Sequence, residues 1–234
     1  MRFIHTADWH LGRRLGGESF LPAQRQILEQ LIHFVHSDRP DAILISGDLY
    51  DRAVPPPEAV EVLNDVLVQL QALNVPVIVI AGNHDSAERL AFLRHLLRHQ
   101  NLHITGWPEV DPKPLVLQDE WGAVHFHCVP FCEPAVVRSR LGASDVRTFD
   151  EAMAACLQPI RASLNLNARH VLLAHGSVLG ARTTPSSERR LTGLHPRRRT
   201  GGQVTSGLDD TGPQTLPGAR TPDWSVIASR CTGL

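Results

Sequence analysis

The segment "AILISGDLYDRAVPPP", residues 42–57, combines an apolar run, a polar loop and three prolines. The run from Ala42 to Ile45 is followed by a glycine and by two carboxylates, Asp48 and Asp51. Continuous apolar runs of this length are typical of parallel strands that are buried on both faces. Pro57 suits the first turn of a helix. The segment therefore predicts a buried strand, a polar loop and then a helix.

The same alternation of strand and helix extends to both sides of this segment. Apolar runs from Arg2 to Thr6 and from Val75 to Ile80 are bounded by Asp, Gly or Pro. Residues 22–36 and 57–73 carry apolar side chains at helical spacing. The order β-α-β-α-β implies parallel strands that are joined by right-handed crossovers.

The pattern continues with shorter elements up to about residue 181. We expect helices at 87–98 and 148–163, short strands at 102–104, 115–117 and 123–129, and a fourth buried strand at 169–174. These elements predict an α/β fold in which a layered β-sheet sandwich is flanked by helices.

Residues 182–234 differ in composition, because Thr, Gly, Arg and Pro dominate and apolar residues show no period. Such a stretch cannot bury enough apolar surface to offset its loss of conformational entropy. We predict a domain at 1–181 and a low-complexity, largely irregular tail at 182–234. Only the short apolar run from Trp224 to Ala228 is expected to dock locally.

Composition places the chain among ordinary globular proteins, with 234 residues, 20% charged side chains and a formal net charge of −1. The first ten residues contain no apolar signal segment, and no apolar run is long enough to span a membrane. We therefore expect a cytoplasmic protein without membrane contact. The four cysteines form no C-x-x-C pair, which favours buried reduced thiols over a zinc or redox motif.

Four of the predicted strands end in side chains that commonly bind metals. They are Asp8 and His10 in "TADWHLG", Asp48 in "SGDLYD", Asn83, His84 and Asp85 in "AGNHDS", and His175 in "LAHGS". The carboxyl ends of parallel strands converge on one crevice, so these side chains can meet. Oxygen and imidazole donors without thiolates suit Mn²⁺, Fe²⁺ or Mg²⁺.

One carboxylate shared between two cations would hold them at the spacing that is used to activate water for phosphoryl displacement. Asp48 lies on the central motif and is the predicted bridge. A single Asp at a strand end is more often a helix cap or a turn residue, and a single His is more often structural. The occurrence of four such motifs in this order favours a metal centre.

The patterns D-x-H, G-D-x-x-D and G-N-H-D resemble those of the calcineurin-like metallophosphoesterase superfamily. The fuller motifs "DWHLG", "GDLYD" and "GNHDS" resemble its SbcD branch of DNA double-strand-break nucleases, over about residues 1–181. The resemblance implies that Asp8 and His10 hold one Mn²⁺, with Mg²⁺ as the alternative metal. It also implies that Asp48 bridges to a second ion held by Asn83 and His175.

The resemblance assigns supporting roles to further residues. His84 is similar to the family histidine that stabilises or protonates the leaving oxygen, a role that suits a group titrating near neutral pH. Asp85 is expected to orient that imidazole, and Asp51 to support the same site. Arg13 and Arg14, directly after "HLG", are candidates for contact with DNA phosphates.

The sequence departs from the family pattern after His175. The family continues to a G-H-x-H motif and a capping domain, and neither is found here, which leaves the metal shells two ligands short. His195 in "GLHPR" is the only later histidine and is not expected to replace them. "SSERRLT" resembles the start of the family continuation, so we hypothesise a shifted reading frame. If the other two frames beyond the codon for Leu191 encode no G-H-x-H, that hypothesis is wrong.

The resemblance implies a metal-dependent DNA nuclease subunit, exonuclease or endonuclease, that acts in repair and recombination on breaks or hairpins. Its implied partners are DNA, an SbcC-type ATPase and a second copy of the chain. Two alternatives stay open from the sequence. One is a truncated, weakly active or inactive form, and the other is a general phosphoesterase that acts on small substrates.

Overall fold

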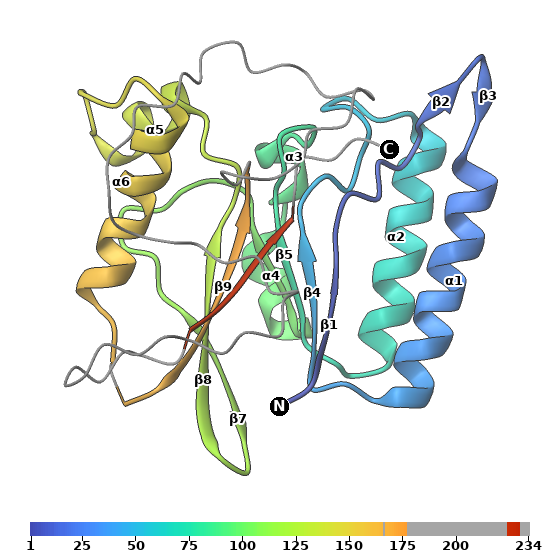
Figure 1. The fold of residues 1–234 in the computed structure, drawn as a ribbon. Helices are drawn as coiled ribbons and strands as arrows, with labels where there is room; N and C mark the ends of the chain where they lie inside the picture. Colours follow the sequence, from blue (N-terminus) through green and yellow to red (C-terminus); the bar gives the residue numbers. More distant parts are fainter. Residues whose placement is uncertain (166, 177–223, 230–234) are drawn as a thin grey trace, which may run out of the picture.

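Two four-stranded sheets pack against each other and helices cover their outer faces (Figure 1). The computed structural model describes residues 1–165 and 167–176, and the backbone of 224–229. The first sheet is parallel throughout, in the order β1-β4-β5-β6. Its strands are β1 (Phe3–Thr6), β4 (Ala42–Ser46), β5 (Val77–Ile80) and β6 (Leu102–Thr105).

The second sheet has the order β10-β9-β8-β7. Its strands are β7 (Leu115–Asp119), β8 (Gly122–Val129), β9 (Arg169–His175) and β10 (Trp224–Ser229). Only β7 runs antiparallel to its neighbour, β8. The predicted sheet sandwich is therefore confirmed.

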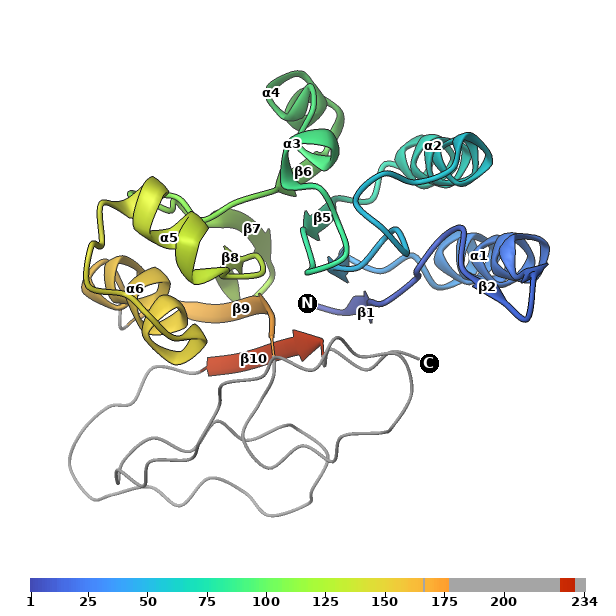
Figure 2. The same ribbon diagram turned by 90° about the horizontal axis from the view of Figure 1, so that it is seen from above.

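Helices α1 (Leu21–Asp38) and α2 (Pro57–Ala72) cover the first sheet, and α5 (Pro134–Leu141) and α6 (Phe149–Ala162) cover the second (Figure 2). A hairpin of β2 (Arg14–Leu15) and β3 (Glu18–Ser19) precedes α1. The hairpin and α5 were not predicted. None of the helices in the described residues is long and apolar enough to cross a membrane.

The single helix predicted at 87–98 is wrong. The structure has two short helices, α3 (Ala87–Leu90) and α4 (Arg94–Leu97), followed by the 3-10 turn η1 (Arg98–Gln100). Leu93, between α3 and α4, has a φ of 61°. A right-handed helix cannot continue through a residue in the left-handed region, so the chain turns there.

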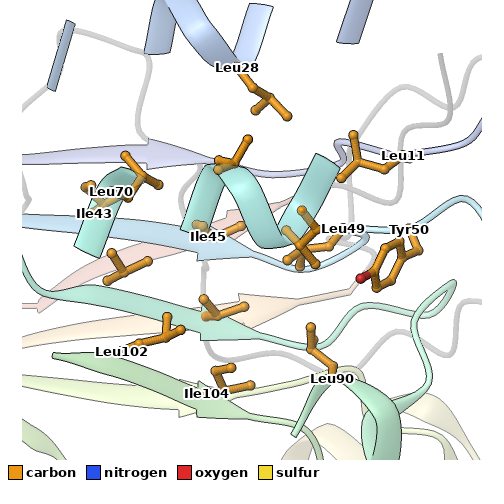
Figure 3. Packing of buried hydrophobic residues seen from close by; sticks show 14 of the residues in the cluster. Leu11, Leu28, Ile43, Ile45, Leu49, Tyr50, Leu70, Leu90, Leu102 and Ile104 are labelled. Carbon is orange, nitrogen blue, oxygen red and sulfur yellow. The ribbon is translucent and has the colours of Figure 1, made fainter. Parts of the chain in front are cut away.

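Apolar side chains form three clusters that correspond to the spaces between layers. The cluster between the sheets contains Ala42, Leu44, Ile78, Ile80, Val124, Phe126, Val171 and Leu173. The alternate residues of β4, including Ile43 and Ile45, face α1 and α2 with Leu28 and Leu70 (Figure 3). Burial on both faces explains why β4 is a continuous apolar run.

Strand β10 lies within the region that was predicted to be irregular. It pairs in parallel with β9, from Trp224 opposite His170 to Ser229 opposite His175. Local docking was expected of this apolar run, but its pairing as a strand was not. The edge of β9 offers main-chain hydrogen-bonding groups to which an extended β-branched segment can add. His195 and the segment concerned in the reading-frame hypothesis lie outside the described residues.

The sequence predicts buried reduced thiols, and the three cysteines in the described part of the chain differ in burial. Cys128, Cys132 and Cys156 are all free, and Cys132 and Cys156 are buried. Cys231 lies outside the described residues.

Ion pairs at Asp119 join the end of β7 to the start of β9 and to the amino group of Met1. The Arg169 guanidinium donates to both carboxylate oxygens of Asp119, and the amino group of Met1 lies 2.7 Å from Oδ2. The hydrogen bonds from Arg169, followed by that from the amino group, hold the pKa of Asp119 well below its ordinary value.

Replacing Asp119 by asparagine is therefore expected to lower the Tm at neutral pH. A depressed pKa in the folded state means that the stabilisation is present above the ordinary carboxyl pKa of about 3.9 and is lost as the pH falls below it. The difference in Tm between wild type and variant should therefore shrink between pH 5 and pH 3. Asp111→Asn, at an exposed pair with Lys113, is the control and should change little. A constant difference across this pH range would contradict the assignment.

Candidate metal centre

The carboxyl ends of β1, β4, β5 and β9 bring polar side chains to one edge of the sandwich. Strand β4 continues into Gly47 and Asp48, β5 into Asn83, and β9 ends at His175. The loop after β1 runs beside the loop after β4, because main-chain N–H groups of Asp8 and His10 donate to carbonyls of Gly47 and Asp48 at 3.0 and 2.9 Å. The predicted residues therefore lie together.

One part of the site is formed by Asp8, His10 and Asp48. His10 Nε2 lies 3.7 Å from Asp48 Oδ2 and 4.0 Å from Asp8 Oδ1, and the His10 side chain is only 6% exposed. Within the described residues, Asp8 Oδ1 and both ring nitrogens of His10 are buried without a hydrogen-bond partner. Buried polar atoms are normally paired, so these atoms fit the donor set of a metal ion.

The other part of the site is formed by Asp48, Asn83 and His175. His175 Nδ1 lies 2.8 Å from the Ser46 carbonyl, which can only accept, so this nitrogen carries the proton of the neutral ring. Its Nε2 lone pair then faces Asn83 Oδ1 at 3.0 Å and Asp48 Oδ2 at 3.6 Å. Three electron-rich atoms that face one another at these distances fit the donor set of a metal ion.

Asp48 belongs to both groups of atoms that are close enough to share an ion. One group is Asp8, Asp48 and His175, and the other is His10, Asp48 and His84, with ligand atoms within 4.8 Å of one another in each. This grouping pairs Asp8 with His175, whereas the sequence resemblance pairs it with His10. Asp48, which is 1% exposed, is common to both descriptions.

The imidazole of His84 is fixed by main-chain contacts. Its backbone N–H donates to Asp48 Oδ1 at 2.8 Å, and its ring Nδ1 lies 2.8 Å from the Asp51 carbonyl. A carbonyl only accepts, so the ring proton of neutral His84 is on Nδ1 and the lone pair is on Nε2. The ring stands edge-on to His10, with centroids 4.7 Å apart. Nε2 is therefore the nitrogen that can exchange a proton or bind a metal.

Asp85 was expected to orient the His84 imidazole, but its carboxylate makes other contacts. It accepts hydrogen bonds from the main-chain N–H groups of Gly82, Tyr50 and Leu49, at 2.9, 3.0 and 3.3 Å. These bonds join the loop after β5 to the loop after β4. The imidazole is held instead by the main-chain carbonyl of Asp51.

The main chain is strained at three of these residues. Asp8, His10 and Asp48 have φ values of 56°, 45° and 52°, in the left-handed region. Each costs about 1 kcal/mol relative to ordinary backbone, and such conformations cluster at functional sites. The surrounding loops must therefore hold the conformation that aims these side chains at one another.

Burial and mutual repulsion shape the electrostatics of the site. Burial, followed by the charges of Asp48 and Asp85, raises the pKa of Asp8 to about 8. Burial also raises the pKa of Asp85, although three backbone N–H donors oppose the shift, and it lowers the pKa of His10. Several carboxylates at one partly buried place suit a divalent cation, which would remove the repulsion between them.

Two residues that support the site carry no recognisable sequence signal. Gln24 of α1 donates from Nε2 to the carbonyls of Trp9 and His10 and accepts from the Gly12 N–H, which braces the loop that carries His10. Phe131 donates its N–H to the Ala81 carbonyl, and its ring stands edge-on to His175. Gln24 lies 14 positions from His10, and Phe131 lies on a different element from His175.

The two arginines predicted to contact DNA lie beside the site, at the β2–β3 hairpin. Arg14 is exposed and its guanidinium donates to the Gly17 carbonyl at the tip of the hairpin. Arg13 is half-buried, and its charge contributes to the lowered pKa of His10. Of the two arginines, only Arg13 is shown to act electrostatically on a residue of the site.

Replacing Gly82 by alanine is expected to disrupt the site and lower the free energy of unfolding by about 3 kcal/mol. An added Cβ would overlap the carboxylate and the main-chain nitrogen of Asp48, with Cγ at 2.7 Å. Gly176→Ala is the matched control, because a Cβ there would meet only Met153 Cε at 3.5 Å. Urea unfolding of both variants measures the difference, and equal stabilities would contradict the tight packing at Gly82.

Comparisons with known proteins identify the family of the chain. The calcineurin-like phosphoesterase family matches residues 1–177. The chain is also 34% identical over 193 residues to the SbcD component of the nuclease SbcCD from Staphylococcus epidermidis, a match that covers 82% of this chain and 50% of the relative. The chain thus spans about half the length of this curated relative. It belongs to the calcineurin-like phosphoesterase family.

Proposed function

We propose that this chain is a metal-dependent nuclease subunit that hydrolyses phosphodiester bonds in DNA. The observation that carries the proposal is the convergence of Asp8, His10, Asp48, Asn83 and His175 at the carboxyl ends of four strands. Within the described residues, Asp8 Oδ1 and the His10 ring nitrogens are buried there without hydrogen bonds. Buried polar atoms without hydrogen-bond partners destabilise the fold, unless a ligand such as a metal ion contacts them.

The donor set suits two divalent cations, Mn²⁺ or the alternative Mg²⁺. Asp8 and His10 would hold one ion, Asn83 and His175 the other, and Asp48 would contact both. When bound, such ions activate water and stabilise the oxygens of an in-line phosphoryl displacement. The strained loops keep the ligands aimed inward, so little reorganisation is needed on binding.

His84 is proposed to donate a proton to the leaving oxygen of the substrate. In its protonated form, Nδ1–H donates to the Asp51 carbonyl and Nε2–H faces the site. Transfer of the Nε2 proton leaves the neutral tautomer that the Asp51 carbonyl favours. The main-chain contact thus selects which nitrogen delivers the proton.

DNA is favoured over small substrates by the hairpin that follows His10. Half-buried Arg13 acts electrostatically on His10, and exposed Arg14 follows it directly in the sequence, so we expect phosphates of a polynucleotide that continue past the scissile bond to meet this positive charge. The name of the Staphylococcus epidermidis relative, a component of the nuclease SbcCD, supports the same substrate class and an SbcC-type ATPase partner for this chain. Break or hairpin processing would be the setting, and a second copy of the chain is a further proposed partner.

Two alternatives stay open. A general phosphoesterase would cleave small diesters but not DNA. A weakly active or inactive form is favoured by one observation, that each group of possible His and Asp ligand atoms in the described residues contains three residues, with Asp48 shared between the two groups.

Metal content and cleavage, measured on the same preparation, separate these functions. The nuclease is expected to bind two Mn²⁺ per chain, to cleave linear and hairpin DNA, and to lose activity in EDTA until Mn²⁺ is restored. Cleavage of bis(p-nitrophenyl) phosphate without cleavage of DNA would identify the general phosphoesterase. Less than one ion per chain together with no cleavage of either substrate would identify the inactive form.

A further inference from the structure

Two buried thiols face each other in the apolar layer between the second sheet and its helices. Cys132 lies in the connection from β8 to α5, and Cys156 lies within α6. Their Sγ atoms are 3.2 Å apart, and the residues are 3% and 5% exposed. The Cys132 S–H is within hydrogen-bonding distance of both Cys156 Sγ and the Pro130 carbonyl.

We propose that Cys132 and Cys156 are an oxidisable pair that forms an intramolecular disulfide when the protein meets hydrogen peroxide. The sulfur atoms must approach by about 1 Å to reach a covalent distance of about 2.05 Å. They are 24 residues apart in the sequence, so no C-x-x-C spacing marks them. The fold alone brings them together.

The oxidation can be written as two balanced steps. The Cys156 thiolate attacks one oxygen of the peroxide, the O–O bond breaks and hydroxide leaves, which produces a sulfenic acid on Cys156. The Cys132 sulfur then attacks Cys156 Sγ, the S–O bond breaks, and water leaves as the disulfide forms. Two thiols are oxidised and one hydrogen peroxide is reduced to two waters.

The local contacts favour Cys156 as the sulfur that reacts first. The hydrogen bond from Cys132 lowers the pKa of the Cys156 thiol, although burial opposes this shift. Burial raises the pKa of the Cys128 thiol to about 12, although a hydrogen bond with Thr105 opposes this shift. The thiolate is the reactive species, so Cys156 has the advantage despite its burial.

The disulfide would tie α6 to a segment that touches the metal centre. Phe131, next to Cys132, packs against Phe149 at the start of α6 with the two rings tilted and their centroids 5.5 Å apart. Its N–H also donates to the Ala81 carbonyl at the end of β5, and its ring stands against His175. Closing the pair would therefore restrain the 130–133 segment behind His175.

Peptide mapping of the whole chain tests the proposal without any assay of activity. A Cys231→Ser background removes the cysteine outside the described residues, and EDTA removes metals that decompose peroxide. After peroxide treatment and alkylation under denaturing conditions, we expect one cross-linked pair of peptides containing Cys132 and Cys156, two hydrogens lighter than the reduced pair. Dithiothreitol should reverse it, and Cys128 should be alkylated. Two free thiols, a sulfinic acid on either residue, or a link to Cys128 would overturn the proposal.

Single substitutions test the order of events. In Cys132→Ser, the sulfenic acid on Cys156 has no resolving thiol and should be trapped by dimedone, whereas Cys156→Ser should yield much less adduct on Cys132. Equal adducts in both variants would overturn the assignment of Cys156. Cys128→Ser is the control and should leave the yield of cross-link unchanged. In the wild-type chain, oxidation should slow hydrogen exchange in the 130–133 segment, a readout that stands even if a variant fails to fold.

Discussion

Replacing Asp48 by asparagine is expected to abolish binding of both divalent cations and to lower phosphodiester hydrolysis by more than about 100-fold. Asp48 is common to both groups of atoms that could share an ion, and no other residue of the described chain is. An amide oxygen can take the position of the carboxylate oxygen but lacks its charge. The substitution should therefore weaken the binding of both ions, whereas a substitution of His175 should weaken the binding of one.

The same substitution should leave the fold intact. The side-chain oxygen of the introduced asparagine could still accept the hydrogen bond from the His84 N–H that Asp48 Oδ1 now accepts. In EDTA, the Tm of the variant should equal or exceed that of the wild type, because the charge of Asp48 is one cause of the raised pKa of Asp8. Elemental analysis and calorimetry measure the two effects. Asp65→Asn, at an exposed ion pair on α2, is the control, and a normal Mn²⁺ content in Asp48→Asn would reject the bridging role.

The strands that carry the site could be predicted because their signals are local. Strands β4 and β5 are buried on both faces and form continuous apolar runs, and β9 contains a shorter apolar run at 171–174. Each apolar run is followed by polar residues, and the parallel order of the strands places these residues at one edge of the sheets. Asp48 and His175 could thus be brought together from sequence, although 127 positions separate their numbers.

Contacts between distant segments could not be predicted in the same way. Asp85 was expected to orient the His84 imidazole, yet its carboxylate accepts from main-chain N–H groups, and the main-chain carbonyl of Asp51 contacts the imidazole instead. Almost any residue type can supply a main-chain N–H or carbonyl, so the sequence does not indicate where such a hydrogen bond forms. The bracing by Gln24 and the approach of Cys132 to Cys156 depend in the same way on how layers pack.

The break between α3 and α4 has a similar explanation. Residues 87–98 carry apolar side chains at helical spacing, and no glycine or proline interrupts them. The left-handed turn is at Leu93, a residue type that disfavours it, so packing outweighs local preference there. Sequence periodicity describes the helix that such a segment would form alone, and the layer against which it packs decides where it bends.

Replacing His84 by asparagine is expected to lower kcat on DNA by about 100-fold to 10,000-fold while the Mn²⁺ content stays unchanged. Asparagine can keep a donor near the Asp51 carbonyl, but it has no equivalent of Nε2. If His84 serves as a proton donor, the loss should be much smaller on bis(p-nitrophenyl) phosphate, because p-nitrophenolate leaves readily without a proton. The ratio of the two losses is the measurement.

The geometry also allows the opposite outcome, since His84 shares a group of possible ligand atoms with His10 and Asp48. If His84 binds a cation, its replacement should reduce the Mn²⁺ content and lower hydrolysis of both substrates by similar factors. His99→Asn, at an exposed position in η1, controls for the loss of an imidazole elsewhere and should change neither quantity. Metal content and leaving-group dependence together decide between the two roles. Replacing a proton donor should make the loss of activity depend on the leaving group and leave the Mn²⁺ content unchanged. Replacing a metal ligand should lower the Mn²⁺ content.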